Sequence, residues 1–114
     1  MTRDPEKFLF DILDSCRFLM DFTAGATADI YRQNRPFRRV VERELQIIGE
    51  ALMQLKAIRP EMAAGISESD RIIGFRHVIV HGYFALDVDT VWKIIEEKLP
   101  TLCREIELLL GPTI

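Results

Sequence analysis

Apolar side chains recur every three or four residues along most of the chain, which is the spacing of one buried face of an α-helix. In the first such stretch the apolar positions are Phe8, Leu9, Ile12, Leu13, Cys16, Leu19 and Met20. Asp4 can accept a hydrogen bond from the first turn, and Pro5 has the fixed φ that suits the first helical position. The pattern predicts a helix that begins at residue 5 and ends near Gly25.

A second, longer helix is predicted between two prolines. After a looser segment at residues 31–34, Pro36 suits a helix start, and Arg59 followed by Pro60 supplies the stop. The apolar stripe of this helix is Val41, Leu45, Ile48, Leu52 and Leu55. The polar side is Arg39, Arg43, Gln46 and Glu50. Glu44 lies beside the stripe, where it is either a packed polar group or a residue that faces a second subunit.

Two further helices follow. The third is predicted to run to about Phe84, and the fourth to begin near Val88. Their candidate N-caps are Ser67, Ser69 and Asp70 for the third helix, and Asp87 and Asp89 for the fourth. Pro100 lies inside the last apolar pattern and predicts a kink, and Gly111 and Pro112 are expected to end the helix. Because no alternating pattern predicts a strand, the sequence indicates an all-α fold, an antiparallel bundle of four to five helices.

Length and composition place further limits on the protein. A chain of 114 residues, 48% hydrophobic and 29% charged, predicts one globular domain over residues 1–114. No apolar run approaches the roughly 20 residues that a membrane helix needs, and the N-terminus is not a basic secretory signal, so we expect a cytoplasmic protein without membrane contact. Cys16 and Cys103 lack metal or redox spacing and are expected to be buried, reduced thiols.

The charge distribution restricts where a nucleic acid can bind. The net charge of −3 argues against broad, nonspecific coating of nucleic acid, so any RNA site must be local. One basic cluster stands out, opposed in its interval only by Glu42: Arg32, Arg35, Arg38, Arg39 and Arg43. It is either a solvated helix surface or a contribution to binding RNA or an acidic partner.

The run from Arg76 to Tyr83 concentrates groups suited to phosphate chemistry. An arginine fork fits phosphate oxygens, and an imidazole exchanges protons near neutral pH. RNA can be cut without a metal ion when its own 2′-hydroxyl attacks the neighbouring phosphate. His81 can then transfer protons while Arg76 stabilises the charged phosphate, with His77 as a weaker candidate for assistance. The predicted products carry a 2′,3′-cyclic phosphate and a 5′-hydroxyl.

The spacing of Arg76 and His81 raises a geometric difficulty. Five residues of an ideal helix separate two side chains by about 140° around the axis, so a regular isolated helix points them apart. Either the helix loosens near Gly82, or a two-fold dimer brings Arg76 of one subunit toward His81 of its mate. Tyr83 lies on nearly the same face as Arg76 and is a packing residue if it has no chemical role.

A metal site and a transferase site are weaker interpretations of the same segment. His77 and His81 are four residues apart, but no Glu stands at the H-E-x-x-H position and no third ligand is near in sequence. We therefore expect neither a metal ion nor another cofactor. Asp87 and Asp89 superficially resemble a transferase carboxylate pair, yet no Gly-Ser phosphate loop precedes them, and helix capping explains them better.

Three elements in order resemble the HepT branch of the HEPN superfamily. They are Ile-Gly-Glu-Ala at residues 48–51, Arg-x4-His-x-Tyr at Arg76, His81 and Tyr83, and Val-Trp-Lys-Ile-Ile at residues 91–95. The resemblance spans nearly the whole chain, and the three elements together are far more specific than any one of them. It implies a HEPN-like helical bundle whose ribonuclease cleft forms between protomers, which favours the homodimer, with higher oligomers left open.

The resemblance also implies a biological role. HepT-like proteins are endoribonuclease toxins of type VII toxin–antitoxin systems, paired with an MNT-type nucleotidyltransferase antitoxin that adds AMP to the tyrosine of the motif. On this chain that residue is Tyr83, and a bulky, negative phosphate beside Arg76 would exclude RNA. Glu50 is either a surface carboxylate or a support that positions Arg43 or Arg76.

Two other functions stay open at this point. The chain can be a noncatalytic adaptor that binds nucleotide or the transferase and serves as its substrate, with Arg76, His81 and Tyr83 recognising phosphate without cutting it. It can also be a purely structural dimer whose histidines satisfy core hydrogen bonds. Cleavage of RNA by purified protein separates the first of these from the enzyme.

Overall fold

The computed structural model describes residues 4–67, 69–81 and 87–111, and within these ranges the chain is helical with no strand. In chain order the elements are α1 (Pro5–Phe22), α2 (Ala28–Gln33), α3 (Arg35–Ile58), α4 (Pro60–Ala64), α5 (Ser69–His81), α6 (Val88–Lys93), the π-helical turn η1 (Ile94–Lys98) and α7 (Leu99–Leu110). The predicted all-α class is confirmed, and two short helices, α2 and α4, join the long ones.

The predicted signals at the start of α1 are confirmed. Asp4 accepts a hydrogen bond from the backbone N–H of Glu6 at 3.0 Å, and Pro5 occupies the first turn. The helix ends at Phe22, earlier than the predicted end near Gly25, because the Thr23 hydroxyl donates to the carbonyl of Leu19 and closes the last turn. Gly25 follows with a φ of 77°, a left-handed conformation that suits glycine in the turn.

The looser segment predicted at residues 31–34 is wrong, because most of it belongs to the short helix α2. Thr27 caps this helix by accepting a hydrogen bond from the backbone N–H of Ile30 at 3.3 Å. Tyr31 is buried, and its hydroxyl donates to the carboxylate of Glu42 at 2.8 Å. That bond anchors α2 to α3. Six residues are too few to reveal a helical period in sequence.

The long helix α3 follows its prediction closely. Asn34 accepts a hydrogen bond from the backbone N–H of Phe37 at 3.0 Å, and the helix stops at Ile58, just before Arg59 and Pro60. The predicted apolar stripe is buried: Val41, Leu45, Ile48, Leu52 and Leu55. Glu44 is half-buried beside it.

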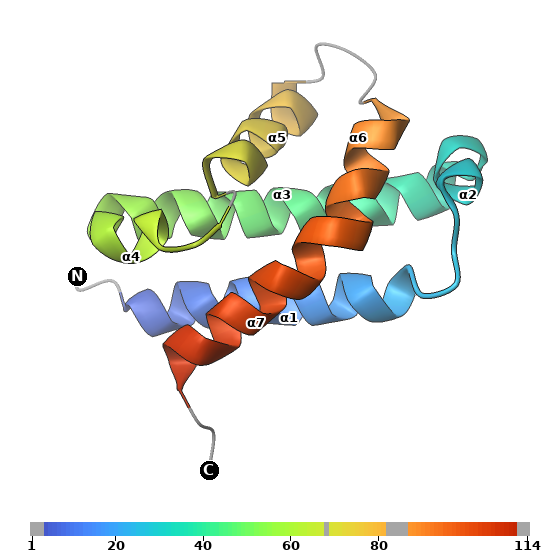
Figure 1. Ribbon diagram of the computed structural model, residues 1–114. Coiled ribbons are helices and arrows are strands. Elements are labelled where there is room, and N and C mark those ends of the chain that lie inside the picture. The colour runs from blue at the N-terminus through green and yellow to red at the C-terminus, as the bar shows by residue number, and fades with distance from the viewer. Residues whose placement is uncertain (1–3, 68, 82–86, 112–114) are drawn as a thin grey trace.

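The interruption predicted at Pro100 takes the form of η1. The backbone N–H of Leu99 bonds to the carbonyl of Ile94, one residue further back than in an α-helix. This wider turn stands immediately before Pro100, whose ring cannot donate a hydrogen bond and crowds the preceding turn. The predicted end at Gly111 is confirmed, with a φ of 79°. In Figure 1 α6, η1 and α7 run as one continuous path.

The helices pack around a core between α1 and α3. Figure 1 shows α1 and α3 side by side and antiparallel, with α5 over α3 and α7 crossing α1, and the same pairs make the most extensive helix contacts. Cys16 and Cys103 are both buried and not bonded to each other, as predicted. Burial raises the pKa of the Cys16 thiol. None of the described helices is both long and apolar enough to cross a bilayer.

Candidate functional site

Arg76 lies on the face of α5 that packs against α3. It is partly buried, and its Cβ sits directly over Gly49. A Cβ placed on Gly49 would lie 2.5 Å from the Cβ of Arg76 and 3.1 Å from the carbonyl oxygen of Ile72. Real Cβ atoms do not approach so closely, so the two helices can reach this separation only with glycine at position 49.

The polar end of Arg76 has no carboxylate partner among the described residues. Its Nε is buried and finds no hydrogen-bond acceptor there. Such a donor costs about 1–3 kcal/mol relative to a satisfied one, so its position needs an explanation. A guanidinium that no described carboxylate neutralises is suited to receive an anion.

The remaining residues of the motif are only partly covered by the structure. His77 is exposed on α5. His81 is the last residue of α5, and its side chain is outside the described part, as is all of Tyr83. The loosening predicted near Gly82 also lies outside the described residues. The convergence of Arg76 with His81 of a second copy therefore stays a prediction.

Glu50 and Arg43 are both exposed on α3. Glu50 lines a shallow depression of about 220 Å³ with Phe8 and Asp11 of α1, together with Ile47 and Gln54. Gly49, the neighbouring residue, instead meets α5. Glu50 is the sequence neighbour of Gly49, which contacts Arg76, but in the structure Glu50 lies on the side of α3 that faces α1. Its support of Arg43 or Arg76 stays a prediction.

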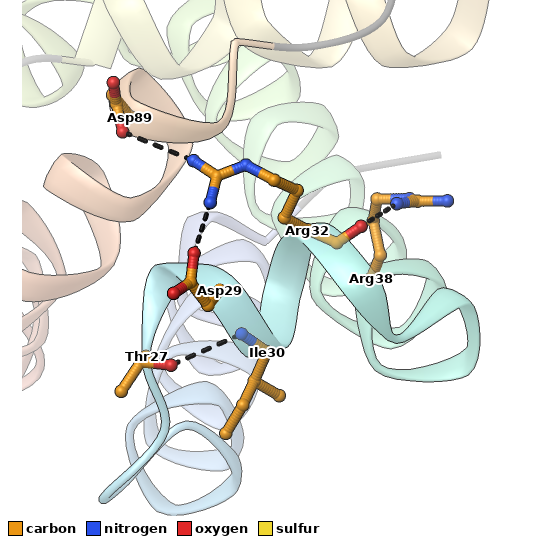
Figure 2. A network of polar contacts seen from close by, with 6 residues as sticks. All are labelled: Thr27, Asp29, Ile30, Arg32, Arg38 and Asp89. Atoms are coloured by element: carbon orange, nitrogen blue, oxygen red, sulfur yellow. Dashed lines mark hydrogen bonds and ion pairs between the residues drawn. The ribbon is translucent and has the colours of Figure 1, made fainter.

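The basic cluster of the sequence separates into two groups. Figure 2 shows Arg32 between Asp29 of its own helix and Asp89 of α6, with an Arg32 to Asp89 separation of 4.0 Å. In the same view the Arg38 guanidinium donates to the carbonyl of Arg32 at 2.9 Å. These two arginines make polar contacts that link α2 to α3 and α6. The other members are exposed and form no ion pair within the described ranges: Arg35, Arg39 and Arg43.

Sequence reasoning missed the part that Gly49 plays. Gly49 belongs to the Ile-Gly-Glu-Ala element, and the sequence alone predicts no separate role for it. A signal was present, because glycine inside a long helix is unfavourable by about 1 kcal/mol relative to alanine and calls for a packing reason. What the sequence could not give is which helix comes close at that point.

Comparisons with known proteins agree with one another. The sequence model of the family described as ribonuclease HepT-like matches residues 12–109. A protein of Methanocaldococcus jannaschii that is named provisionally as an RNase is 32% identical over 107 residues, covering 94% of this chain and 97% of that protein. A protein of Thermococcus cleftensis, named provisionally as ribonuclease HepT, is 29% identical, and the match covers 96% of this chain and 98% of that protein. No solved structure matches the chain.

Proposed function

The chain belongs to the ribonuclease HepT-like family, and from that membership we propose that it is an endoribonuclease toxin that cuts RNA without a metal ion. The observation that carries the proposal is the state of Arg76. Its root is fixed against α3 at Gly49, and its guanidinium has no acidic partner within the described residues. This is the condition in which an arginine can bind a phosphodiester.

The chemistry follows from the structure of RNA itself. The 2′-hydroxyl attacks the adjacent phosphorus, a base accepts the hydroxyl proton, and the departing 5′-oxygen receives a proton. The products are a 2′,3′-cyclic phosphate and a 5′-hydroxyl end. Arg76 would hold the nonbridging oxygens, whose charge rises in the transition state, and His81 would transfer the protons.

The proposal needs two copies of the chain. Because α5 is regular up to His81, five residues of helix separate it from Arg76, and such residues lie about 140° apart around one axis. A two-fold dimer removes the difficulty by pairing Arg76 of one protomer with His81 of the other. Higher assemblies of such dimers are compatible with the same pairing.

Regulation by a nucleotidyltransferase is the second part of the proposal. Addition of AMP to the phenol of Tyr83 would attach a bulky, negative phosphate seven residues from Arg76 in the sequence, and there it would compete with RNA by charge and by volume. An MNT-type antitoxin that carries out this transfer would switch the ribonuclease off without refolding it. An intact-mass increase of one or more AMP groups after coexpression with an MNT-type nucleotidyltransferase is the expected sign.

The experiment that tests cleavage uses purified protein, a synthetic RNA and EDTA. Cyclic phosphate ends in the products, lost in His81→Ala, support the enzyme. Intact RNA, with protein that still binds AMP or the transferase, would instead support the noncatalytic adaptor. Growth arrest on expression of the protein alone should likewise disappear with His81→Ala.

Mixing two inactive variants tests the shared cleft. Dimers that combine Arg76→Ala with His81→Ala contain one site with both functional side chains and one site with neither. If the protomers exchange at random, half of the dimers are mixed, so about a quarter of the wild-type activity returns. A site built within one chain regains nothing, and that result would exclude the shared cleft.

A further inference from the structure

Gly49 stands in the interior of α3, where glycine is a poor choice for helix stability. The residue is buried, and its φ does not lie in the left-handed region, so no special backbone conformation requires it. The reason must be sought in what lies beside it. A Cβ placed on Gly49 would have three atoms of α5 close to it. They are the Cβ of Arg76 at 2.5 Å, the carbonyl oxygen of Ile72 at 3.1 Å and the Cγ of Arg76 at 3.2 Å.

The obstacle to a side chain at position 49 is rigid. The Cβ of Arg76 is attached directly to the backbone of α5, and the oxygen of Ile72 is part of that backbone. A flexible side-chain end could turn aside, but these atoms move only if α5 itself moves. Because helix interfaces are close-packed, an added methyl group at Gly49 must displace α5 from α3 at Arg76.

Packing is what fixes Arg76 in the described part of the chain. No ion pair or hydrogen bond to a described residue holds its guanidinium, and its Nε is buried without an acceptor. We propose that Gly49 is a positioning residue: the absence of its side chain sets the depth of Arg76 against α3 and so the reach of the guanidinium. This inference rests on the proposed function, in which that guanidinium contacts the phosphate of RNA.

The test compares Gly49→Ala with Gly74→Ala. Gly74 is also a helical glycine, is exposed on α5, and would place its Cβ in open space. Gly65→Ala adds a control outside α5, since its Cβ would make only ordinary contacts, the nearest at 3.5 Å. A displacement of about 1 Å can cost a hundredfold in rate. We expect Gly49→Ala to lower kcat by about that factor with a smaller change in KM, and both controls to keep kcat within about twofold.

The Arg76→Ala background separates positioning from general damage. If Gly49 acts mainly through Arg76, adding Gly49→Ala to Arg76→Ala lowers the residual rate far less than Gly49→Ala lowers the wild-type rate. A further loss of the same size as in the wild type would mean that Gly49 supports the whole site, and would overturn the inference. Full activity of Gly49→Ala alone would overturn it as well.

Folding of the variants is followed by circular dichroism and thermal melting. Should Gly49→Ala not fold, Arg76→Gly is added, since it removes the two side-chain atoms that the new methyl group would meet. If the double variant folds, the result supports the contact between position 49 and Arg76. If it does not fold, the added methyl group clashes with something other than the Arg76 side chain, which contradicts the inference. Failure of the proposed function looks different, because the wild-type protein would then leave RNA intact, or Arg76→Ala would cut RNA as fast as the wild type.

Discussion

Two arginines of this chain, Arg32 and Arg76, illustrate how differently the same side chain can be placed. Arg32 of α2 lies between Asp29 and Asp89, and its carbonyl accepts a hydrogen bond from Arg38 (Figure 2). Arg76 of α5 is packed against Gly49, has a buried Nε without an acceptor, and has no acidic partner among the described residues. Both lie on helices that contact another helix, so position in the fold does not distinguish them.

The difference lies in how the positive charge is compensated. Carboxylates near Arg32 neutralise much of its field, so it has little to gain from an added phosphate. No carboxylate in the described part of the chain compensates the charge of Arg76, and its buried root would limit the number of rotamers frozen if an anion bound there. Charge compensation within the chain is therefore a better guide to function here than the presence of arginine alone.

The largest effect expected from this comparison is the loss of catalysis in Arg76→Ala. Removal of one group that stabilises transition-state charge lowers kcat by about a hundred- to a thousandfold. The free energy of unfolding should change by about 1 kcal/mol or less, because the variant also removes a buried donor without an acceptor. RNA cleavage and urea unfolding measure the two quantities. Arg32→Ala serves as the matched control, and equal loss of activity in both variants would abolish the distinction.

A smaller effect is expected from Arg39→Gln combined with Arg43→Gln. The two side chains are exposed one turn apart on α3 and have no ion pair within the described ranges. If they contact RNA phosphates, the double variant has a KM that is several-fold higher and an unchanged kcat. The negative slope of log affinity against log salt becomes shallower by about 1.4. Fluorescence titration at several salt concentrations measures the slope. Arg17→Gln is the control, because Arg17 pairs with Glu107 at 3.3 Å; an unchanged slope in the double variant identifies a solvated helix surface.

Tyr31→Phe tests a structural polar contact of α2, the helix that also carries Arg32. It removes the hydroxyl that donates to Glu42 and leaves that partly buried carboxylate without this donor, which should cost about 1–2 kcal/mol of stability while cleavage continues. Burial, and then the bond to Glu42, raises the pKa of the Tyr31 phenol above its ordinary value near 10. Loss of activity in a folded Tyr31→Phe protein would contradict the structural role.

The pH dependence of the Tyr31→Phe effect has a definite sign. Above about pH 10 the unfolded chain releases the phenol proton while the folded chain keeps it, so this contribution to stability falls as pH rises. The stability difference between wild type and Tyr31→Phe should therefore narrow above about pH 10. Urea unfolding at neutral and alkaline pH measures this stability difference. If the difference does not change with pH, folding does not raise the pKa of the Tyr31 phenol.

The sequence predicted those parts of the fold that depend on local signals. Asn34, Pro36 and Pro60 act on their own neighbours, and α3 falls within one residue of its predicted bounds at each end. The short helix α2 was missed because six residues are too few to show a helical period, and the bond from Tyr31 to Glu42 that anchors it joins separate elements. Pro100 marked an interruption correctly, but the π-helical form that it takes depends on hydrogen bonding that composition does not reveal.

In the candidate site, too, the sequence predicted the local motif but not the contacts between helices. Arg76 was identified from the motif that it forms with His81 and Tyr83, and the expectation that it binds phosphate comes from the chemistry of its guanidinium. Its contact with Gly49 could not be predicted, because it depends on the separation of α3 and α5. Likewise, sequence alone grouped Arg32 with the other basic residues, since Asp89, one of its two partners, is distant in the chain.

Arg32→Ala should give the smallest change. The Arg32 side chain is 50% exposed, Asp29 73% and Asp89 86%, so water already solvates all three charges and salt screens them. Exposed pairs of this kind contribute about 0–1 kcal/mol, and the loss should shrink further at high salt. Melting curves at low and high salt measure both effects. A loss well above 1 kcal/mol that persists at high salt would mean that Arg32 supports α2 and α6 by packing its aliphatic stem and not by charge. The contrast with Arg76 would then concern how each side chain is packed, with charge compensation a lesser factor.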